Sequence, residues 1–203
     1  MYLFVGAHPD DIEIGSGGFL IQSIQNGIEC CIITFSDCSE QEGNKGIIEE
    51  YKQSMDYLGI DDYFLYHLPN TKLPYHNDKI RDILEKIKIK NDIDLVVTHS
   101  VNSIHQDHKI VGEECRRVFR YSSLISYEDP KSTSQYFSPQ LYISLSERIL
   151  KKKLELLNIY ESQLRRDVYG TKIFENIARV RGVEIGTKAA EAYEVIRIKN
   201  YFK

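Results

Sequence analysis

Several features that mark specialised classes of protein are missing from this sequence. It contains no tryptophan, only four cysteines and only five prolines among 203 residues. Hydrophobic residues make up 42% and charged residues 28% of the chain, which excludes a disordered, collagen-like or low-complexity protein. No apolar run approaches the length of a membrane-spanning helix. Length and composition therefore predict one folded domain over residues 1–203, with no membrane partner.

The sequence also lacks an excess of positive charge. The chain has 26 lysines and arginines against 30 acidic residues, and its formal net charge is −4. The longest basic run is Lys151-Lys152-Lys153, which we interpret as the solvated face of a helix. Proteins that bind nucleic acid neutralise phosphates with many basic side chains. We therefore expect no nucleic-acid partner.

The cysteines are not spaced for a cysteine-based zinc site, because no two of them form a C-x-x-C pair. They are Cys30, Cys31, Cys38 and Cys115. Free thiols in a chain of this size suit a reducing compartment. The sequence opens with a short apolar run followed by polar residues, which is not the pattern of a signal peptide. Together these observations predict a cytoplasmic protein.

Short apolar runs alternate with amphipathic segments along the first two thirds of the chain. The expected strands are Tyr2–Ala7, Glu29–Phe35, Tyr63–Leu68 and Leu95–His99. The expected helices are Gly17–Asn26, Ile47–Gly59, Lys79–Lys90 and a helix from about Gln106. The less regular last third suggests strands at Leu124–Ser126, Gln140–Leu145 and Tyr193–Ile198, with helices at Ser146–Tyr160 and Ile173–Arg181. This alternation predicts an α/β, Rossmann-like fold with a mostly parallel sheet and helices on both faces.

A polar cluster, His8-Pro9-Asp10-Asp11, directly follows the first expected strand. Open parallel sheets bind ligands at the carboxyl ends of their strands. Adjacent carboxylates point in different directions, so one could face a metal while the other faces a reacting water. Imidazole and carboxylate are both ligands for Zn²⁺. The alternative is structural, with Asp10 and Asp11 capping the next helix.

Glycines follow this cluster at Gly15, Gly17 and Gly18. The stretch Gly15–Gly18 could be taken for a phosphate-binding loop, with Asp37 after the second strand in the place of a ribose-binding acid. However, the G-x-G-x-x-G pattern is absent and charged side chains occupy the turn after the first strand. A nucleotide-binding α/β protein therefore stays open as the less favoured alternative.

A second cluster, His105-Gln106-Asp107-His108, follows the fourth expected strand. His105 and His108 are three residues apart, so they share one face of a helical turn. By itself the cluster could be a polar helix start, where the helix dipole favours Asp107. If the first and fourth strands are neighbours at the switch point, however, both clusters face one crevice.

The two clusters together resemble the LmbE/PIG-L family of zinc-dependent N-acetylsugar deacetylases. The matching residues are Ala7 to Asp11 with Glu13 and the glycines, then His105-x-Asp107-His108. Further matches are Leu58-Gly59, Tyr160-x-Ser162-Gln163, Arg181-Gly182-x-x-x-Gly186 and Ala190-Glu191-Ala192-Tyr193. The resemblance covers essentially the whole chain. It implies a hydrolase that removes acetyl from the amide of a GlcNAc-type conjugate.

The resemblance also implies a role for each residue of the two clusters. The metal ligands would be His8, Asp11 and His108. Asp10 would be the general base, His105 would stabilise the oxyanion and protonate the leaving amine, and Asp107 would support His105. Zn²⁺ is the expected cofactor, although two imidazoles and one carboxylate also accept Fe²⁺ or Mn²⁺. The family further allows a homo-oligomer, or a non-catalytic member that binds a sugar or a partner in the same crevice.

The chain departs from the family where a sugar would be held. Ile47 stands in place of an arginine and Asn70 in place of an aspartate. As candidates for substrate contacts we name Glu40, Asn70, His99 and Tyr142. Because the chain has no tryptophan, stacking on a sugar ring would fall to tyrosine or phenylalanine.

Overall fold

The computed structural model describes residues 1–132, 136–165 and 170–199. In this part of the chain, seven strands form one sheet in the order β3-β2-β1-β4-β5-β7-β6. The strands are β1 (Tyr2–Gly6), β2 (Cys30–Thr34), β3 (Tyr63–Leu65), β4 (Leu95–His99), β5 (Ser123–Tyr127), β6 (Leu141–Ser144) and β7 (Ala190–Arg197). The first five in spatial order are parallel, whereas β7 is antiparallel to both of its neighbours. The predicted mostly parallel sheet is confirmed.

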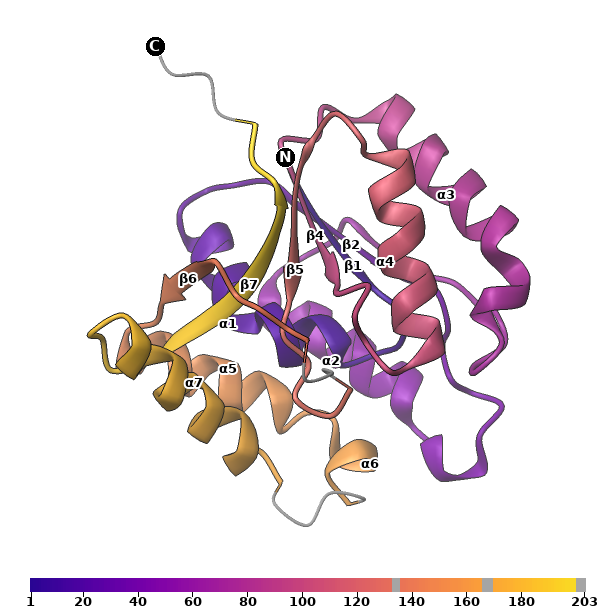
Figure 1. Cartoon of the computed structure of the whole chain (residues 1–203). Coiled ribbons are helices and arrows are strands. Elements are labelled where there is room, and N and C mark those ends of the chain that lie inside the picture. Colours follow the sequence, from indigo (N-terminus) through magenta and orange to yellow (C-terminus); the bar gives the residue numbers. More distant parts are fainter. Residues whose placement is uncertain (133–135, 166–169, 200–203) are drawn as a thin grey trace.

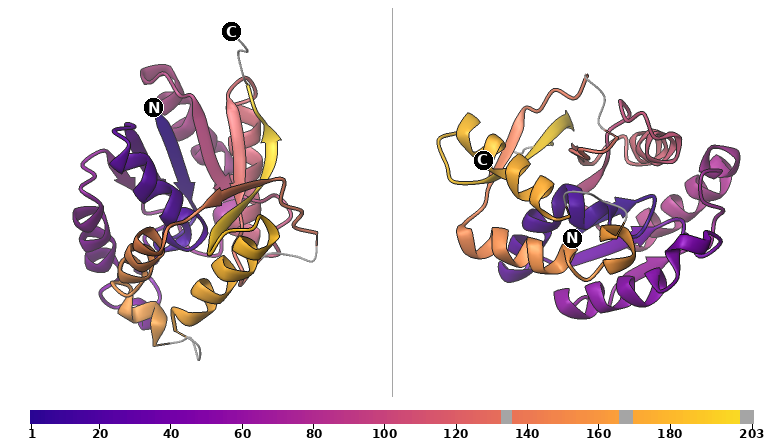
Figure 2. Two further views of the ribbon diagram at one scale, coloured as in Figure 1. Left: turned by 90° about the vertical axis from the view of Figure 1, so that its left-hand side faces the viewer. Right: turned by 90° about the horizontal axis from the view of Figure 1, so that it is seen from below.

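Helices cover both faces of the sheet (Figure 1, Figure 2). They are α1 (Asp11–Gln25), α2 (Ile47–Leu58), α3 (Asn77–Lys90), α4 (Gln106–Val118), α5 (Glu147–Leu157), α6 (Glu161–Leu164) and α7 (Lys172–Glu184), with short 3-10 turns η1 (Glu42–Asn44) and η2 (Leu73–His76). The core under α3 and α4 is separate from the core under α1, α2 and α5. Helix α7 packs on β7 and α5.

The central strands are apolar on both sides because both sides are covered. Phe4 of β1 belongs to the core under α1, while its neighbours Leu3 and Val5 belong to the core under α3 and α4. Strand β1 pairs with β4 through the register Tyr2↔Leu95, in parallel. The chain segments that follow β1 and β4 therefore emerge side by side at one edge of the sheet, as predicted.

Helix α1 begins at Asp11, six residues before the predicted start at Gly17. Glycine has low helix propensity, but packing overrides it here. A Cβ at Gly15 would lie 2.1 Å from the ring of Tyr127, and a Cβ at Gly18 would lie 2.7 Å from Leu145. The glycines therefore lie inside a buried helix that touches its neighbours closely, and they do not form a phosphate-binding loop.

The interpretation of the basic run as a solvated face is wrong for Lys153. Its side chain is buried on the inner face of α5, where Nζ donates to Glu191 Oε1 (2.6 Å) and to the carbonyl oxygen of Ile14 (2.7 Å). Lys151 is exposed, as expected. A run of three lysines does not reveal which of them is buried, because the partner of Lys153 lies on β7, 38 residues further along the chain.

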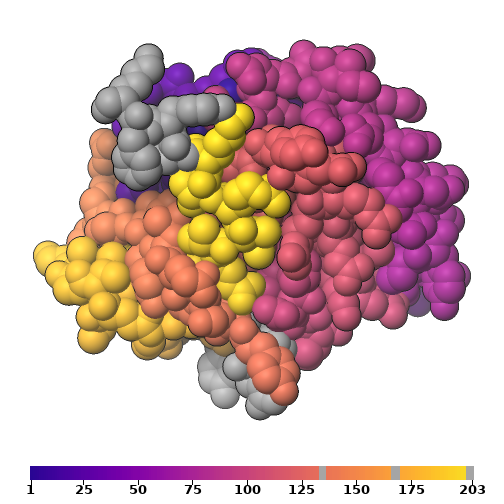
Figure 3. All heavy atoms as spheres, turned by 45° about the horizontal axis from the view of Figure 1, so that its top comes forward, coloured from indigo at the N-terminus to yellow at the C-terminus, as the bar shows by residue number. Residues whose placement is uncertain are grey.

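The last strand in the sequence, β7, does not lie at an edge of the sheet. Strand β7 lies between β5 and β6. Figure 3 shows its residues, in yellow, at the surface between the orange residues after about 140 and the red residues near 120. Within the described segments, no helix is both long enough and apolar enough to cross a bilayer.

Candidate functional site

Three side chains from the two predicted clusters converge at the carboxyl edge of the sheet, which faces downward in Figure 1. His8 Nδ1 lies 3.2 Å from His108 Nε2. Asp11 completes the triangle, with Oδ2 3.4 Å from His8 Nδ1 and Oδ1 3.4 Å from His108 Nε2. The structure therefore brings together the three residues that the resemblance implied as metal ligands.

This triangle fits a divalent cation. Tetrahedral Zn²⁺ with bonds of about 2.0–2.1 Å holds its ligand atoms about 3.3 Å apart, which matches the observed separations. His105 and His99 lie close enough to take part, since each belongs to a group of three ligand atoms that lie within 4.8 Å of one another. The donor set thus suits a divalent metal ion.

Electrostatics around the triangle favour a cation. Burial alone would lower the pKa of His8, but the carboxylates of Asp11 and Asp107 outweigh it and raise the pKa to about 10. Burial likewise opposes ionisation of Asp11, yet His108, His99 and His8 hold its pKa well below the usual value.

The turn between β1 and α1 is built around Asp11. Its Oδ2 accepts hydrogen bonds from the backbone amides of His8 (2.7 Å) and Ala7 (3.0 Å), which precede the helix. Asp10 sits at the N-cap position with φ 84°, a conformation that costs about 1 kcal/mol or more for a non-glycine residue, and makes no capping hydrogen bond. The capping alternative is therefore wrong for both residues.

The carboxylate of Asp107 contacts His8 directly, and it acts on His105 only through its charge, which partly offsets the lowering of the pKa of that ring by burial. Its Oδ2 lies 3.1 Å from His8 Nε2 and accepts from the amide of Thr71 (2.7 Å), while Oδ1 accepts from the amide of Leu73 (3.1 Å). The carboxylate is fully buried. A proton on His8 Nε2 donated to Asp107 leaves Nδ1 as the ligand atom, which is the usual partnership of metal-binding histidines.

His108 is oriented in the same way, by two residues that the sequence analysis missed. Its Nδ1 lies 3.0 Å from Ser132 Oγ and 3.3 Å from Asp129 Oδ2, so Nε2 is left to face the cavity. Ser132 Oγ also donates to Asp129 Oδ2. Both residues follow β5, the fifth parallel strand, so the rule that pointed to the ends of β1 and β4 applied here as well.

His99 lies beneath the triangle and does not line the cavity. Its ring stacks on that of His108 with centroids 3.9 Å apart, and its Nε2 lies 3.0 Å from Asp11 Oδ2. Burial, together with His108, lowers the pKa of His99 to about 4, so the ring is neutral at neutral pH. The structure thus gives His99 contacts with the triangle and none with the cavity.

Two further side chains, Asp10 and His105, flank the triangle and line the cavity. Burial and the neighbouring Asp11 raise the pKa of Asp10 well above its usual value. No described residue forms a hydrogen bond with its carboxylate. His105 caps α4 through Nδ1, which accepts from the amide of Asp107 (3.3 Å), and its pKa is lowered by burial and by His108. The carboxylate of Asp10, which can accept a proton, and the imidazole of His105 therefore lie beside the candidate metal position.

The cavity has a volume of about 300 Å³ and opens beside these groups. Beyond these groups its lining, which we call the wall, carries the charged Lys131 and several neutral polar side chains, namely Gln41, Asn44, Asn70, Thr71 and Gln163. Ile47 is part of the same wall. Of the predicted substrate contacts, only Asn70 lines the cavity. Glu40 is exposed and outside it. Tyr142, on β6, is also outside it, and its neighbour Glu184 of α7 raises the pKa of its hydroxyl.

Comparisons with known proteins place the chain in a family. The family model described as "PIG-L: GlcNAc-PI de-N-acetylase" matches residues 3–119. The uncharacterized deacetylase YaiS of Escherichia coli (strain K12) is 30% identical over 172 residues, which cover 79% of this chain and 90% of that protein. The diacetylchitobiose deacetylase of Thermococcus kodakarensis is 25% identical over 215 residues, covering 94% of this chain and 79% of that protein.

A solved structure shares the fold over nearly the full length. The conserved protein TT1542 from Thermus thermophilus superposes with a TM-score of 0.82 at 20% identity, covering 99% of this chain and 96% of that chain. At this identity the match shows the fold alone. The family model, by contrast, spans more than half of the chain. The resemblance and the class of enzyme inferred from the two clusters are therefore confirmed, and the chain belongs to the PIG-L family of de-N-acetylases.

Proposed function

We propose that the chain hydrolyses the acetamido group of an N-acetylated sugar, with one divalent cation held by His8, Asp11 and His108. The observation that carries this proposal is the triangle of ligand atoms 3.2–3.4 Å apart, with Asp10 and His105 on its open side. When bound, such a cation acts as a Lewis acid toward the amide carbonyl and acidifies water.

The residues of the chain supply the proton transfers. Asp10 accepts a proton from the attacking water as the carbon–oxygen bond forms. His105, in its protonated form, donates a hydrogen bond to the oxygen that gains negative charge and gives its proton to the nitrogen as the carbon–nitrogen bond breaks. The proton held by Asp10 then restores His105. The raised pKa of Asp10 suits a base that must hold this proton between the two steps.

The proposed substrate presents a neutral, hydroxyl-rich sugar ring to the cavity. Support comes from the wall of side-chain amides, which donate and accept hydrogen bonds without charge. Ile47 and Asn70, which replace a family arginine and aspartate, lie on that wall. The relative from Thermococcus kodakarensis is named for diacetylchitobiose, which has the same chemistry. A GlcNAc-type conjugate or a nucleotide sugar is thus the class to test.

An acetate-release assay tests the proposal. Purified protein of measured metal content is incubated with N-acetylglucosamine, diacetylchitobiose, N-acetylglucosaminides and nucleotide sugars. We expect acetate and a free amine in equal amounts from at least one of them, with about one Zn²⁺ or Fe²⁺ bound per chain. Bound metal without acetate from any substrate would support the non-catalytic alternative instead.

A further inference from the structure

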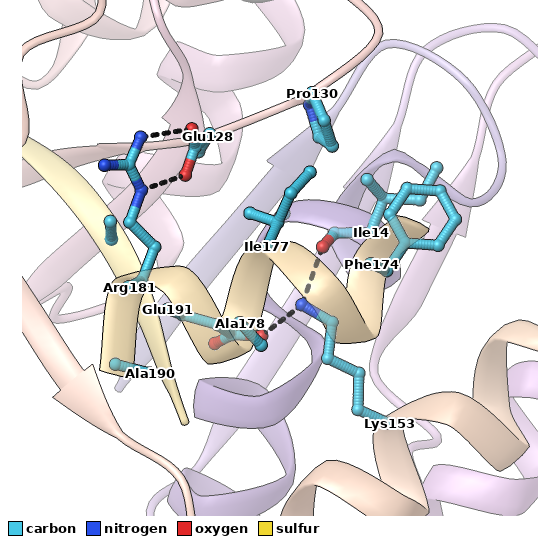
Figure 4. A pocket seen from close by; sticks show the side chains of 12 residues that line it. Ile14, Glu128, Pro130, Lys153, Phe174, Ile177, Ala178, Arg181, Ala190 and Glu191 are labelled. Carbon is cyan, nitrogen blue, oxygen red and sulfur yellow. Dashed lines mark hydrogen bonds and ion pairs between the residues drawn. The ribbon is translucent and has the colours of Figure 1, made fainter. Parts of the chain in front are cut away.

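An ion pair outside the cavity links helix α7 to the segment that carries Asp129. Arg181 Nε donates to Glu128 Oε2 (2.8 Å) and Nη2 donates to Glu128 Oε1 (2.6 Å). Figure 4 shows the two parallel bonds at the rim of a small pocket between α7 and Pro130. The side chains of both partners are largely buried, at 19% and 14% exposure. Two bonds in this geometry fix the plane and position of a carboxylate.

Glu128 is the first residue of the segment 128–132, which ends beside the candidate metal ligand. Its chain neighbour Asp129 contacts His108 Nδ1 at 3.3 Å, and Ser132 contacts the same atom at 3.0 Å. Pro130, between them, restricts the backbone of the segment. A shift of Glu128 would therefore be passed to the two groups that orient the His108 ring.

Helix α7 is a rigid base for Arg181. A Cβ at Gly182 would lie 2.6 Å from the backbone nitrogen of Ala189, so only glycine allows α7 to pack this closely at the start of β7. Gly186 then turns the chain with φ 71°, in the left-handed region that favours glycine. The motif Arg181-Gly182-x-x-x-Gly186, which has no role in the catalytic site, thus fixes the position of one guanidinium.

We propose that Arg181 is a positioning residue for the metal site. By holding Glu128, it keeps Asp129 and Ser132 on Nδ1 of His108 and so keeps Nε2 directed at the cation. This inference rests on the metal site of the proposed function. It does not require that the substrate be a sugar.

The same helix carries a matched control. Arg179 binds Glu147 through two bonds of 2.6 and 2.8 Å, and it joins α7 to α5. Each arginine also has one further partner within α7, Glu184 for Arg181 and Glu175 for Arg179. Glu147, however, begins α5 and contacts none of the cavity residues. The control pair is more exposed, at 37% and 51%, and Arg179 also donates to the carbonyl oxygen of Lys188. Both arginines are anchored on α7, but only Arg181 holds a residue of the segment 128–132.

The test compares Arg181→Gln with Arg179→Gln in the full chain. Metal-stripped protein is titrated with Co²⁺, and both the dissociation constant and the visible absorption of the bound ion are recorded. We expect Arg181→Gln to weaken Co²⁺ binding about tenfold and to change the absorption spectrum, as loss of an outer-shell contact does. Arg179→Gln should bind within about twofold of the wild type.

Two milder variants guard against a folding defect. Arg181→Lys keeps the charge and one contact, so it should recover part of the affinity, while Glu128→Gln should weaken Co²⁺ binding as Arg181→Gln does. Equal Co²⁺ affinity and spectra in all variants, with similar losses of thermal stability, would overturn the inference. Wild-type protein that binds no Co²⁺ would overturn it together with the metal site. Weakened Co²⁺ binding in Arg181→Gln, with no acetate from any sugar, would support it and contradict only the proposed substrate.

Discussion

At the scale of single residues, the two histidines of the metal triangle have the same pattern of contacts. One ring nitrogen of each lies against a carboxylate, that of Asp107 for His8 and that of Asp129 for His108, and the other ring nitrogen faces the cavity. The pattern explains why Asp107 is buried and fully hydrogen-bonded without touching the cavity. We therefore expect Asp107 to affect the affinity of the proposed metal site.

Asp107→Asn should weaken metal binding about 10–100-fold, because the amide no longer offers a charged acceptor to His8. Isothermal titration with Zn²⁺ measures the change. Asp37→Asn is the control, since Asp37 also pairs with a histidine, His67 (2.5 Å), at the same edge of the sheet. Equal affinity in Asp107→Asn and Asp37→Asn would contradict this role.

Asp10→Asn should bind metal as the wild type does and lose turnover by a factor of about 10²–10⁴, the usual contribution of a general base. Acetate release, with metal analysis of the same sample, provides the measurement. Glu40→Gln, an exposed substitution outside the cavity, should leave both quantities unchanged. Turnover retained in Asp10→Asn would remove Asp10 from the mechanism.

At the scale of elements, the start of α1 is decided by contacts that no local pattern reveals. Gly15 faces the ring of Tyr127 and Gly18 faces Leu145, both far along the chain. The sequence placed the apolar runs of the parallel strands correctly, because strands buried on both faces need such runs. It could not place the start of α1, because glycine has low helix propensity and the close contacts that require glycine at positions 15 and 18 come from distant parts of the chain.

Gly15→Ala should destabilise the protein by about 2–3 kcal/mol, because its methyl group would overlap the Tyr127 ring and force α1 away. Gly17→Ala on the same helix is the control, since its Cβ would meet Lys153 at an ordinary 3.5 Å. That variant should be neutral or gain up to about 1 kcal/mol from helix propensity. Urea unfolding of both variants gives the comparison, and a Gly15→Ala protein as stable as Gly17→Ala would refute the packing argument.

The buried ion pair between α5 and β7 leads to another expectation. Lys153→Met leaves the Glu191 carboxylate buried without its ammonium partner, which should cost about 3 kcal/mol of unfolding free energy. Glu191 keeps hydrogen bonds from the amides of Gly18 and Phe19, so the protein should still fold. Lys151→Met, at an exposed position on the same helix, should change stability by less than about 0.5 kcal/mol. Thermal or urea unfolding that shows equal effects would contradict the account.

At the scale of the whole molecule, the site is assembled by strand order. The chain segments after β1, β4 and β5 meet because these strands are neighbours in the sheet. The first two could be predicted from their polar clusters, and the resemblance supplied the roles. The contribution of β5 was missed because Asp129 and Ser132 lie in an irregular stretch without a recognisable motif. Contacts such as Gln163 to Asn44 (3.0 Å), 119 residues apart, have no local signal at all.

The central claim is that one divalent cation, held by His8, Asp11 and His108, is required for amide hydrolysis. The most direct measurement titrates Zn²⁺ into chelator-stripped protein while acetate release from an N-acetylated sugar is followed. The account predicts no release at the start and a linear rise that saturates near one equivalent per chain. Full acetate release from metal-free protein would contradict the account.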